Sequence, residues 1–303
     1  MSDTTLTLIE EKASKTKYPK TQLGMTWYMF KRHKMAMVSL VVLLFLFLVA
    51  IFAKQIMPYD PVKLDPVYAK GRPQPPTAEH WFGTDDLGRD LFSRAVSGAR
   101  VSLSVGFVSV GISVLIGVVL GSLAGFFGGW TDNLIMRIAD IFLSLPTFYL
   151  IISVNSLFKP SIFNVMVVIG VFGWMGVSRL LRSEFLRLKA TDFITAARAV
   201  GVPGLRMVTK HLIPNAIAPV IVNATMGIPS AILLESSLSF LGLGVPPPAA
   251  SWGSMLQDAK TWLHFAWWMW VIPGLLISIT VIAFNFMGDG LRDALDPIER
   301  GRG

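Results

Sequence analysis

The chain has 303 residues, of which 53% are hydrophobic and 15% are charged, with a formal net charge of +8 and no cysteine. Soluble domains carry about 25% charged residues, so this composition excludes an ordinary water-soluble protein and indicates a membrane protein. The lack of cysteine excludes disulfide bridges, thiolate metal sites and cysteine nucleophiles. The positive charge does not indicate nucleic-acid binding, because the basic residues lie between apolar runs instead of gathering on one soluble face.

Six charge-free runs approach the length of a helix that crosses a bilayer, about 20 residues. They cover residues 35–53, 101–131, 141–158, 160–178, 212–234 and 261–288. The third run is short, and Arg137 and Asp140 lie one turn apart at its mouth, so we expect its helix to begin near Leu134. The first run does not read as a cleaved signal peptide, because 34 residues precede it and no small-residue cleavage pattern follows. The sequence therefore predicts an all-α membrane protein with six transmembrane helices.

The distribution of lysine and arginine predicts the orientation of these helices. Six spans place both termini on one side, which collects 18 Lys and Arg residues against nine on the other. Both termini are therefore predicted to be cytoplasmic. The predicted organisation is an N-terminal segment, 1–34, a transmembrane domain, 35–288, and a C-terminal tail, 289–303. Within the transmembrane domain lie an extracytoplasmic segment, 54–100, a cytoplasmic loop, 179–215, and an outer loop, 243–266.

Aromatic residues precede basic ones just before the first span. Trp27, Tyr28 and Phe30 are followed by Lys31 and Arg32. This order predicts a short helix that lies at the cytoplasmic interface of the membrane. An ordinary aromatic and basic anchor explains the same pattern, and the sequence leaves both interpretations open.

Small residues repeat every four positions along the second span. After Ser113 the repeat continues with Gly117, Gly121, Gly125 and Gly129. One face of this helix therefore carries almost no side chains, which lets another backbone approach closely inside lipid. The two interpretations are tight packing within the bundle and a sliding surface for a moving neighbour.

Prolines and polar residues interrupt the later spans. Pro146, Pro229 and Pro273 each remove a backbone hydrogen bond and are expected to kink their helices. The polar residues either line a wet pathway or bond neighbouring helices. These candidates for a translocation pathway are Ser153, Asn155, Asn223, Thr225, Glu235 and Asn285.

Glu235 is the single acid in the apolar run that leads from the fifth span into the outer loop. An ionisable residue inside a membrane segment is a functional candidate. Its distance from the cytoplasmic end places it near the outer boundary, which favours a gate contact or a helix-end hydrogen bond over a proton relay. Glycines, prolines and tryptophans follow it, and we expect this outer loop to fold back into the protein.

Several catalytic and binding motifs are missing. The sequence contains no phosphate-binding loop, no metal-ligand spacing among its four histidines and no nucleophile elbow. The chain is therefore predicted not to be an enzyme and to bind no metal or cofactor itself. Energy for transport must come from an ion gradient or from another subunit.

The cytoplasmic loop carries a helix followed by a sharp turn. Residues 195–199 form helices readily after a possible N-cap at Thr191 or Asp192, and the sequence from Gly201 to Gly204 forces a turn. A second helical stretch, 205–212, leads to the mouth of the fifth span. Two short helices at a tight turn would make a compact knob, while a solvated basic loop is the alternative.

This loop resembles a known pattern. TAARAVGVPGLRMVTKHLIPN, residues 195–215, resembles the "EAA" coupling loop of permease subunits of binding-protein-dependent ABC importers. Three further blocks, at 80–103, 127–150 and 236–256, are similar to the C-type permease of dipeptide, oligopeptide and nickel importers. The resemblance covers nearly everything after Lys20.

The resemblance implies a type I ABC importer architecture in a bacterial cytoplasmic (inner) membrane. The chain would form half of the pathway with a homologous B-type permease, beside two cytoplasmic ATPases, which use ATP and Mg, and an extracytoplasmic solute-binding protein. Thr195 occupies the place of the glutamate that names the motif, and Asp192 lies one turn earlier. The residues that would contact the ATPase or lead into the fifth span are Ala196, Ala197, Arg198, Gly201, His211, Pro214 and Asn215.

The leading hypothesis is an ATP-driven peptide importer subunit without its own ATPase. One alternative is an ion-coupled secondary carrier that uses Glu235, and another is a membrane scaffold that moves nothing. Within the same ABC class, nickel or another small solute is the alternative cargo.

Overall fold

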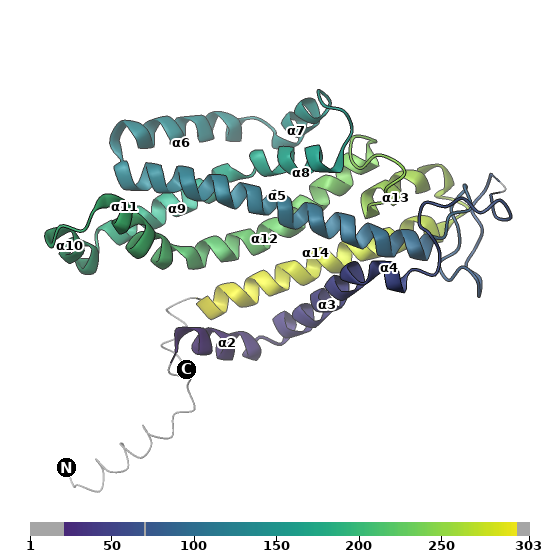
Figure 1. Ribbon diagram of the computed structural model, residues 1–303, viewed down its shortest axis with the longest axis horizontal. Coiled ribbons are helices and arrows are strands. Elements are labelled where there is room, and N and C mark those ends of the chain that lie inside the picture. Colours follow the sequence, from purple (N-terminus) through teal and green to yellow (C-terminus); the bar gives the residue numbers. More distant parts are fainter. Residues whose placement is uncertain (1–20, 70, 296–303) are drawn as a thin grey trace, which may run out of the picture.

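The computed structural model describes residues 21–69 and 71–295, and every regular element in these ranges is a helix (Figure 1). The predicted all-α fold is confirmed. Residues 1–20 and 296–303, parts of the predicted N-terminal segment and C-terminal tail, lie outside the described residues. The helices are α2 Gln22–Arg32, α3 Lys34–Ile51, α4 Ala53–Ile56, α5 Leu91–Phe127, α6 Gly129–Ser144, α7 Thr147–Asn155, α8 Ile162–Val171, α9 Trp174–Lys189, α10 Asp192–Ala199, α11 Gly204–Arg206, the π-helix η1 Met207–Leu212, α12 Ile213–Phe240, α13 Trp252–Ala259, the 3₁₀ helix η2 Lys260–Trp262 and α14 Trp267–Leu295.

Within the described residues, five helical segments are long and apolar enough to cross a membrane, and α6 with α7 makes a sixth if the bent pair is one span. Each of the six predicted runs falls on one of these segments. The boundaries differ by about three turns in several places, and α5 begins ten residues before the predicted start at 101. Asp90 caps this helix by accepting a hydrogen bond from the backbone N–H of Ser93 at 2.7 Å, so α5 includes Arg94 and Arg100.

The third predicted span is broken. α6 already begins at Gly129 and ends at Ser144, and α7 continues after a bend of 89°. Pro146 explains the break, because a residue that precedes proline is driven out of the helical region, and Leu145 has φ −94° and ψ 142°. Arg137 and Asp140 therefore lie inside α6. The sequence predicts them at the mouth of a span, and this prediction is wrong. Pro229 and Pro273 lie within the continuous helices α12 and α14.

The glycine-rich face of α5 packs against α9. A Cβ atom on Gly117 would lie 2.5 Å from the Cβ of Val177, and one on Gly121 would lie 2.7 Å from the backbone oxygen of Ser178. Gly125 meets Phe185 in the same way, at 2.7 Å. These three glycines therefore bring the two helices closer than any larger residue allows.

Gly129 does not belong to this face, which corrects the prediction. It is the first residue of α6, its φ is +55°, and no heavy atom lies within 4 Å of the position of a Cβ. The reason is that α5 ends at Phe127, and Gly128 with φ +68° reverses the chain direction before Gly129.

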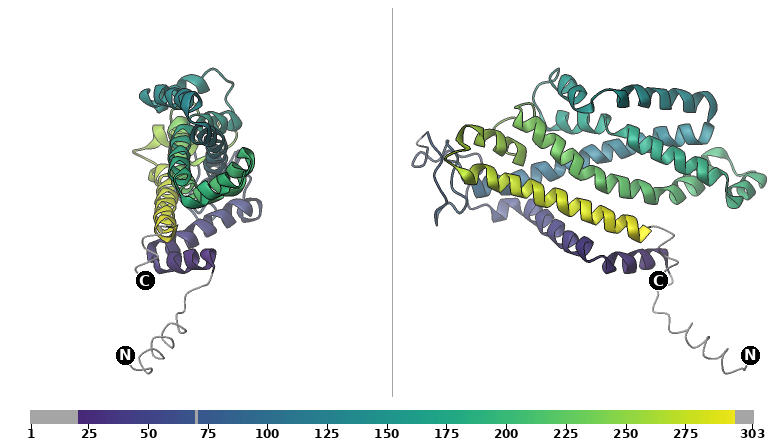
Figure 2. Two further views of the ribbon diagram at one scale, coloured as in Figure 1. Left: turned by 90° about the vertical axis from the view of Figure 1, so that its left-hand side faces the viewer. Right: turned by 180° about the vertical axis from the view of Figure 1, so that it is seen from behind.

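The remaining helices surround α5 (Figures 1 and 2). α12, α14 and α3 pack on one side of it, α8 and α9 on another, and α6 lies at the edge of the bundle away from α2 and α3. α2 forms a helix where the sequence predicted one, with Phe30 buried against Ala36 and Ala294. At the end of the bundle that carries α13, the loop after α12 folds back as predicted. Trp252 is wholly buried and donates a hydrogen bond from Nε1 to the backbone oxygen of Ala95 at 3.0 Å.

A substitution at the glycine face tests its packing role. Gly121→Leu should destabilise the protein by about 2 kcal/mol or more, because the backbone of Ser178 cannot move aside. The matched control is Gly111→Leu on the same helix, where no atom lies within 4 Å of the new Cβ. Thermal unfolding of the purified protein in detergent measures the difference, and equal midpoints for the two variants would show that this face does not hold α5 against α9.

Candidate functional site

The segment between α9 and α12, residues 190–212 and hereafter the α9–α12 loop, carries one separate helix. α10 follows α9 after only Ala190 and Thr191. Thr191 occupies the N-cap position in an extended conformation, but its hydroxyl donates to the carbonyl of Leu188 instead of capping α10. Ile194, the only residue of α10 that is fully buried, packs in a cluster with Leu188 and Leu212. A single apolar anchor thus holds α10 while most of its surface stays free.

Gly201 makes the turn after α10. Its φ is +77°, its N–H donates to the carbonyl of Arg198 at 3.0 Å, and the N–H of Val202 donates to the carbonyl of Ala197 at 3.1 Å. These bonds satisfy the last carbonyls of the helix, and the left-handed conformation favours glycine. No atom of the chain lies within 4 Å of the place where a Cβ would stand. A larger residue at 201 would therefore strain the backbone and project outward, without a clash inside the chain.

The second predicted helix of the loop is not independent, which corrects the two-helix interpretation. α11 and η1 run without interruption into α12 as one helical segment, Gly204–Phe240. The π-helical turns lie directly before Pro214, which has no N–H to continue the ladder of hydrogen bonds. His211 lies in η1, and its carbonyl accepts a bond from the side chain of Asn215 at 2.7 Å. The knob is therefore α10 and its turn, set beside an extension of α12.

The exposed surface of the loop includes alanines and large apolar residues among its polar ones. Ala196 and Arg198 are exposed and Ala197 is half-buried, as the docking interpretation requires. Phe193, Val200 and Leu205 are exposed by 45%, 81% and 79%, and sequence reasoning missed them. The available signal was the presence of large apolar residues beside the alanines in an otherwise polar loop. Clustered exposed apolar side chains outside the spans mark a surface for a protein partner.

Two contacts fix the base of the loop to the end of α5. Lys189 donates from Nζ to the carbonyls of Gly125 and Phe126 at 3.1 and 2.8 Å, where the helix has no further N–H to offer them. A Cβ on Gly204 would lie 3.1 Å from the ring of Phe126, so the far end of the loop also rests on α5. The loop is therefore held against α5 at both of its ends.

A cavity of about 240 Å³ lies between α5, α7, α9 and α12. All of its polar side chains are neutral: Ser109, Ser113, Thr147, Asn223 and Ser230. A second cavity, of about 520 Å³, shares Asn223 and extends toward Glu184 and Arg292. Asn223 and Ser230 lie on one exposed face of α12, and Ser237 continues this face two turns later. α12 thus lines the first cavity with Asn223 and Ser230 and the second with Asn223, while Ser237 lines a separate hollow.

The structure separates the six polar pathway candidates into two groups. Ser153, Asn223 and Asn285 are exposed, and only Asn223 of these lines a described cavity. Asn155 is buried and donates to the carbonyl of Leu243, and Thr225 is buried and donates to the carbonyl of Ile221. Ser230 and Ser237 were missed, because serine in an apolar helix gives the same sequence signal whether its face is open or packed.

Glu235 lies inside the protein and not on an open wall. It is fully buried and accepts a hydrogen bond from the hydroxyl of Ser239 at 2.7 Å. Ser251, which caps α13, donates to the hydroxyl of Ser239 at 3.4 Å. The carboxylate therefore joins the end of α12 to the start of α13, as expected of a helix-end hydrogen bond, and this burial does not favour an ion-coupled carrier.

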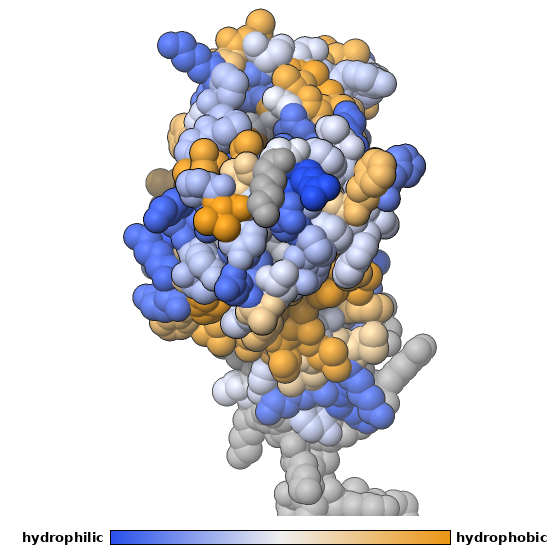
Figure 3. Space-filling model, turned by 90° about the vertical axis from the view of Figure 1, so that its right-hand side faces the viewer, coloured by the Kyte–Doolittle hydropathy of each residue, from blue (hydrophilic) through white to orange (hydrophobic). Residues whose placement is uncertain are grey.

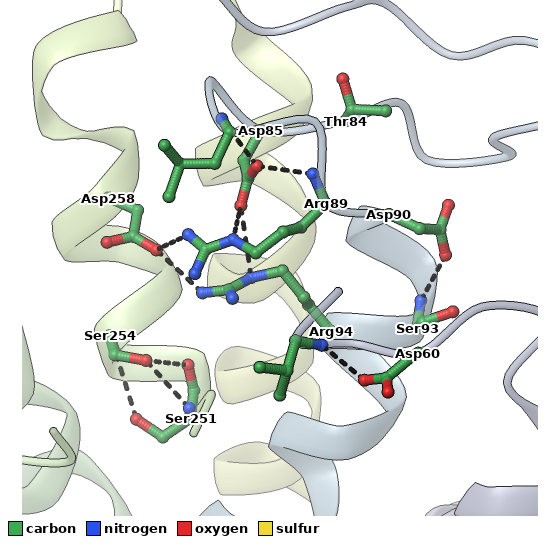
Figure 4. A network of polar contacts seen from close by, with 12 residues as sticks. Asp60, Thr84, Asp85, Arg89, Asp90, Ser93, Arg94, Ser251, Ser254 and Asp258 are labelled. Atoms are coloured by element: carbon green, nitrogen blue, oxygen red, sulfur yellow. Dashed lines mark hydrogen bonds and ion pairs between the residues drawn. The ribbon is translucent and has the colours of Figure 1, made fainter. Parts of the chain in front are cut away.

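A network of charged residues fixes the same end of the bundle (Figure 4). Arg89 donates from Nε to Asp85 at 2.6 Å, and Arg94 donates from Nη2 to Asp258 of α13 at 2.8 Å. Burial raises the pKa of the Asp258 carboxyl, and the two arginines oppose this shift. The segment before α5 is therefore clamped to α13. Figure 3 looks onto this end and shows hydrophilic residues interspersed with apolar ones.

No group of three or more His, Asp or Glu side chains within residues 21–69 and 71–295 is arranged to hold a metal ion.

Comparisons with known proteins identify the family. Residues 117–300 match the family model described as binding-protein-dependent transport system inner membrane component. Residues 21–76 match the family model for the N-terminal transmembrane domain of oligopeptide transport permease C. The chain is 43% identical to the dipeptide transport system permease protein DppC of Alkalihalophilus pseudofirmus, over 88% of this chain and 87% of that protein. It is 41% identical to the oligopeptide transport system permease protein OppC of Bacillus subtilis, over 88% and 87%. With DppC of Haemophilus influenzae it is 40% identical over 98% and 99%.

The fold is also found in a solved transporter. A chain of the MetNI methionine ABC transporter in an inward-facing conformation superposes with a TM-score of 0.57 at 20% identity, covering 68% of this chain and 98% of that chain. The similarity supports the same helical architecture. The matches to the two family models and to the relatives show the family, and the solved structure agrees with it in fold. This multi-pass membrane protein belongs to the inner membrane components of binding-protein-dependent transport systems and is a C-type permease of the ABC importer class.

Proposed function

We propose that this chain is one of two permease subunits of an ATP-driven importer of dipeptides and oligopeptides in a bacterial cytoplasmic membrane. The peptide cargo rests on the names of the relatives above, which are dipeptide and oligopeptide permeases at 40–43% identity. The partners are a homologous B-type permease, two cytoplasmic ATPases that bind ATP and Mg, and an extracytoplasmic solute-binding protein. This chain performs no catalysis itself.

The α9–α12 loop is the observation that carries the coupling part of the proposal. α10 and the Gly201 turn stand out at the end of the bundle opposite α13, with exposed apolar side chains and a single buried anchor (Figure 1). With both termini in the cytoplasm, this end faces the ATPases. Ala196, Ala197 and Arg198 contact an ATPase surface, and Lys189 passes the resulting movement to α5. Pro214 and Asn215 lie where the π-helical turns of this segment pass into α12.

The polar stripe of α12 carries the pathway part. Asn223 and Ser230 form an uncharged face that opens on the first cavity, and Ser237 continues this face two turns later at a separate hollow. Neutral hydroxyl and amide groups form hydrogen bonds with a peptide backbone without favouring one side-chain charge. The stripe therefore admits peptides of varied sequence, and selection rests with the binding protein. Nickel as cargo finds no comparable support among the described residues.

The turn at Gly201 gives a test with a matched control. Gly201→Leu should lower ATP-dependent uptake by about tenfold or more, because leucine at φ +77° is strained by about 1–2 kcal/mol and projects into the ATPase surface. Gly201→Asn should keep uptake within about threefold of the native value, since asparagine tolerates this conformation. Uptake in membrane vesicles and co-purification of the ATPases are the measurements. Normal transport by the leucine variant would rule out the coupling role.

Cysteine accessibility tests the pathway, because the chain has no cysteine of its own. In the assembled transporter Ser230→Cys should react with a water-soluble thiol reagent, and the reaction should block uptake, since this position faces the cavity. Thr225→Cys is the control, because its side chain is buried one turn away on the same helix. Rapid labelling at 225 with none at 230 would place the pathway on the other face of α12.

A further inference from the structure

The α6 helix is attached to the bundle by a narrow stripe. Only Asp132, Ile135 and Ala139 of its sixteen residues are buried. α9, a helix of equal length, buries seven residues. α6 lies along the edge of the bundle in all views (Figures 1 and 2), and its exposed residues include Trp130 and Ile138. Apolar packing alone therefore holds α6 weakly.

Two ion pairs complete the attachment, and both join α6 to α9. Asp132 accepts from two nitrogen atoms of Arg182, Nε and Nη2. Asp140 pairs with Arg179, one turn earlier on α9. A bidentate arginine–carboxylate pair fixes both distance and orientation. The register of α6 against α9 is thus set by charge.

The outer of these pairs lies partway along α6, which forms a candidate membrane span together with α7. Asp140 is eleven residues after Gly129, the start of α6, or roughly 16 Å along a helix. In the isolated chain the side chains of Asp140 and Arg179 are exposed by 54% and 46%. Charges within a membrane span are costly in lipid, and they mark functional positions that face protein or water. An apolar pair would hold the helices together without that cost.

α9 connects these arginines with the α9–α12 loop. Only two residues separate α9 from α10, and the glycine face of α5 holds α9 firmly. On the other side, α6 continues through the bend at Pro146 into α7, where Thr147 and Ile151 form part of the cavity wall. A continuous route therefore runs from α10 through α9 and the ion pairs to α6, α7 and the cavity.

We infer that Arg179 and Arg182, with Asp140 and Asp132, are positioning residues that carry the movement of the coupling helix α10 to α6 and so reshape the solute cavity. The inference rests on the proposed docking of α10 to an ATPase. The ion pairs are suited to this task because they transmit displacement while the sparse apolar contact leaves α6 free to pivot at Pro146.

The test is a charge swap in the complete transporter, reconstituted in vesicles with its binding protein. The quantity measured is peptide taken up for each ATP hydrolysed. Arg179→Asp and Asp140→Arg should each lower this ratio by about tenfold while hydrolysis continues, and the double variant should restore it to within about threefold. The control is Arg187→Gln on the same helix, because Arg187 is 63% exposed and pairs only within α9, with Glu184. This variant should keep the native ratio.

A second measurement covers the case in which a reversed charge prevents insertion. Asp140→Asn with Arg179→Gln removes the link without leaving an unpaired charge. Spin labels on Asn133→Cys and Ser183→Cys, both exposed positions, then report the separation of α6 and α9. With the native pairs this separation should stay constant between the nucleotide-free and ATP-bound states, and without the outer pair it should change or broaden.

The inference would be overturned if both single charge reversals kept the native ratio of peptide taken up to ATP hydrolysed. It would also be overturned if the double variant inserted and assembled but did not restore this ratio. A third contrary result is a distance between the spin labels that stays the same when the outer ion pair is removed. Failure of the proposed ATP-driven import would be recognised by a different result, because native uptake would then proceed without the ATPase subunits.

Discussion

Three glycines of α5 allow the backbones of α5 and α9 to come into contact, and this contact connects the two ends of the protein. Gly117, Gly121 and Gly125 each face an atom of α9 that could not yield to a side chain. α5 extends over 37 residues, from the charged clamp beside α13 to the carbonyls that bind Lys189. The α5–α9 pair is therefore the closely packed frame that links the two ends of the permease.

The charged residues of the chain lie in distinct places around the α5–α9 pair. The arginines near α13 are buried in ion pairs with Asp85 and Asp258, which fix the outer segment. Those of α9 reach sideways to α6, of whose sixteen residues three are buried. The α12 face that opens on the cavities has only neutral polar groups. The outer segment is thus held by buried ion pairs, and the α12 face of the proposed solute path carries no charge that would retain a peptide.

The break at Pro146 gives the bundle one element that differs from the rest. α12 and α14 contain prolines as well, yet they remain continuous. α6 and α7 meet at 89° instead, and α7 ends in a hydrogen bond from Asn155 to the loop after α12. α7 is therefore held at both ends, by the bend and by this bond, while α6 is free along most of its surface. A shift of α6 and α7 can therefore alter the wall of the cavity without disturbing the packing of α5 against α9.

The sequence alone determined the all-α fold, the approximate position of each span and the α10 turn, because hydrophobic length, glycine spacing and helix-breaking residues act locally. It did not determine where α6 begins, that Gly129 leaves the glycine face, or that α11 continues into α12. Nor could it tell Asn223 from Thr225, two residues apart, or show that Glu235 is enclosed. Which face of a helix is open depends on the neighbours that pack against it, and the pairing of Asp140 with Arg179 joins residues 39 positions apart. Only the tertiary structure decides contacts of that kind, since they arise from the arrangement of whole helices.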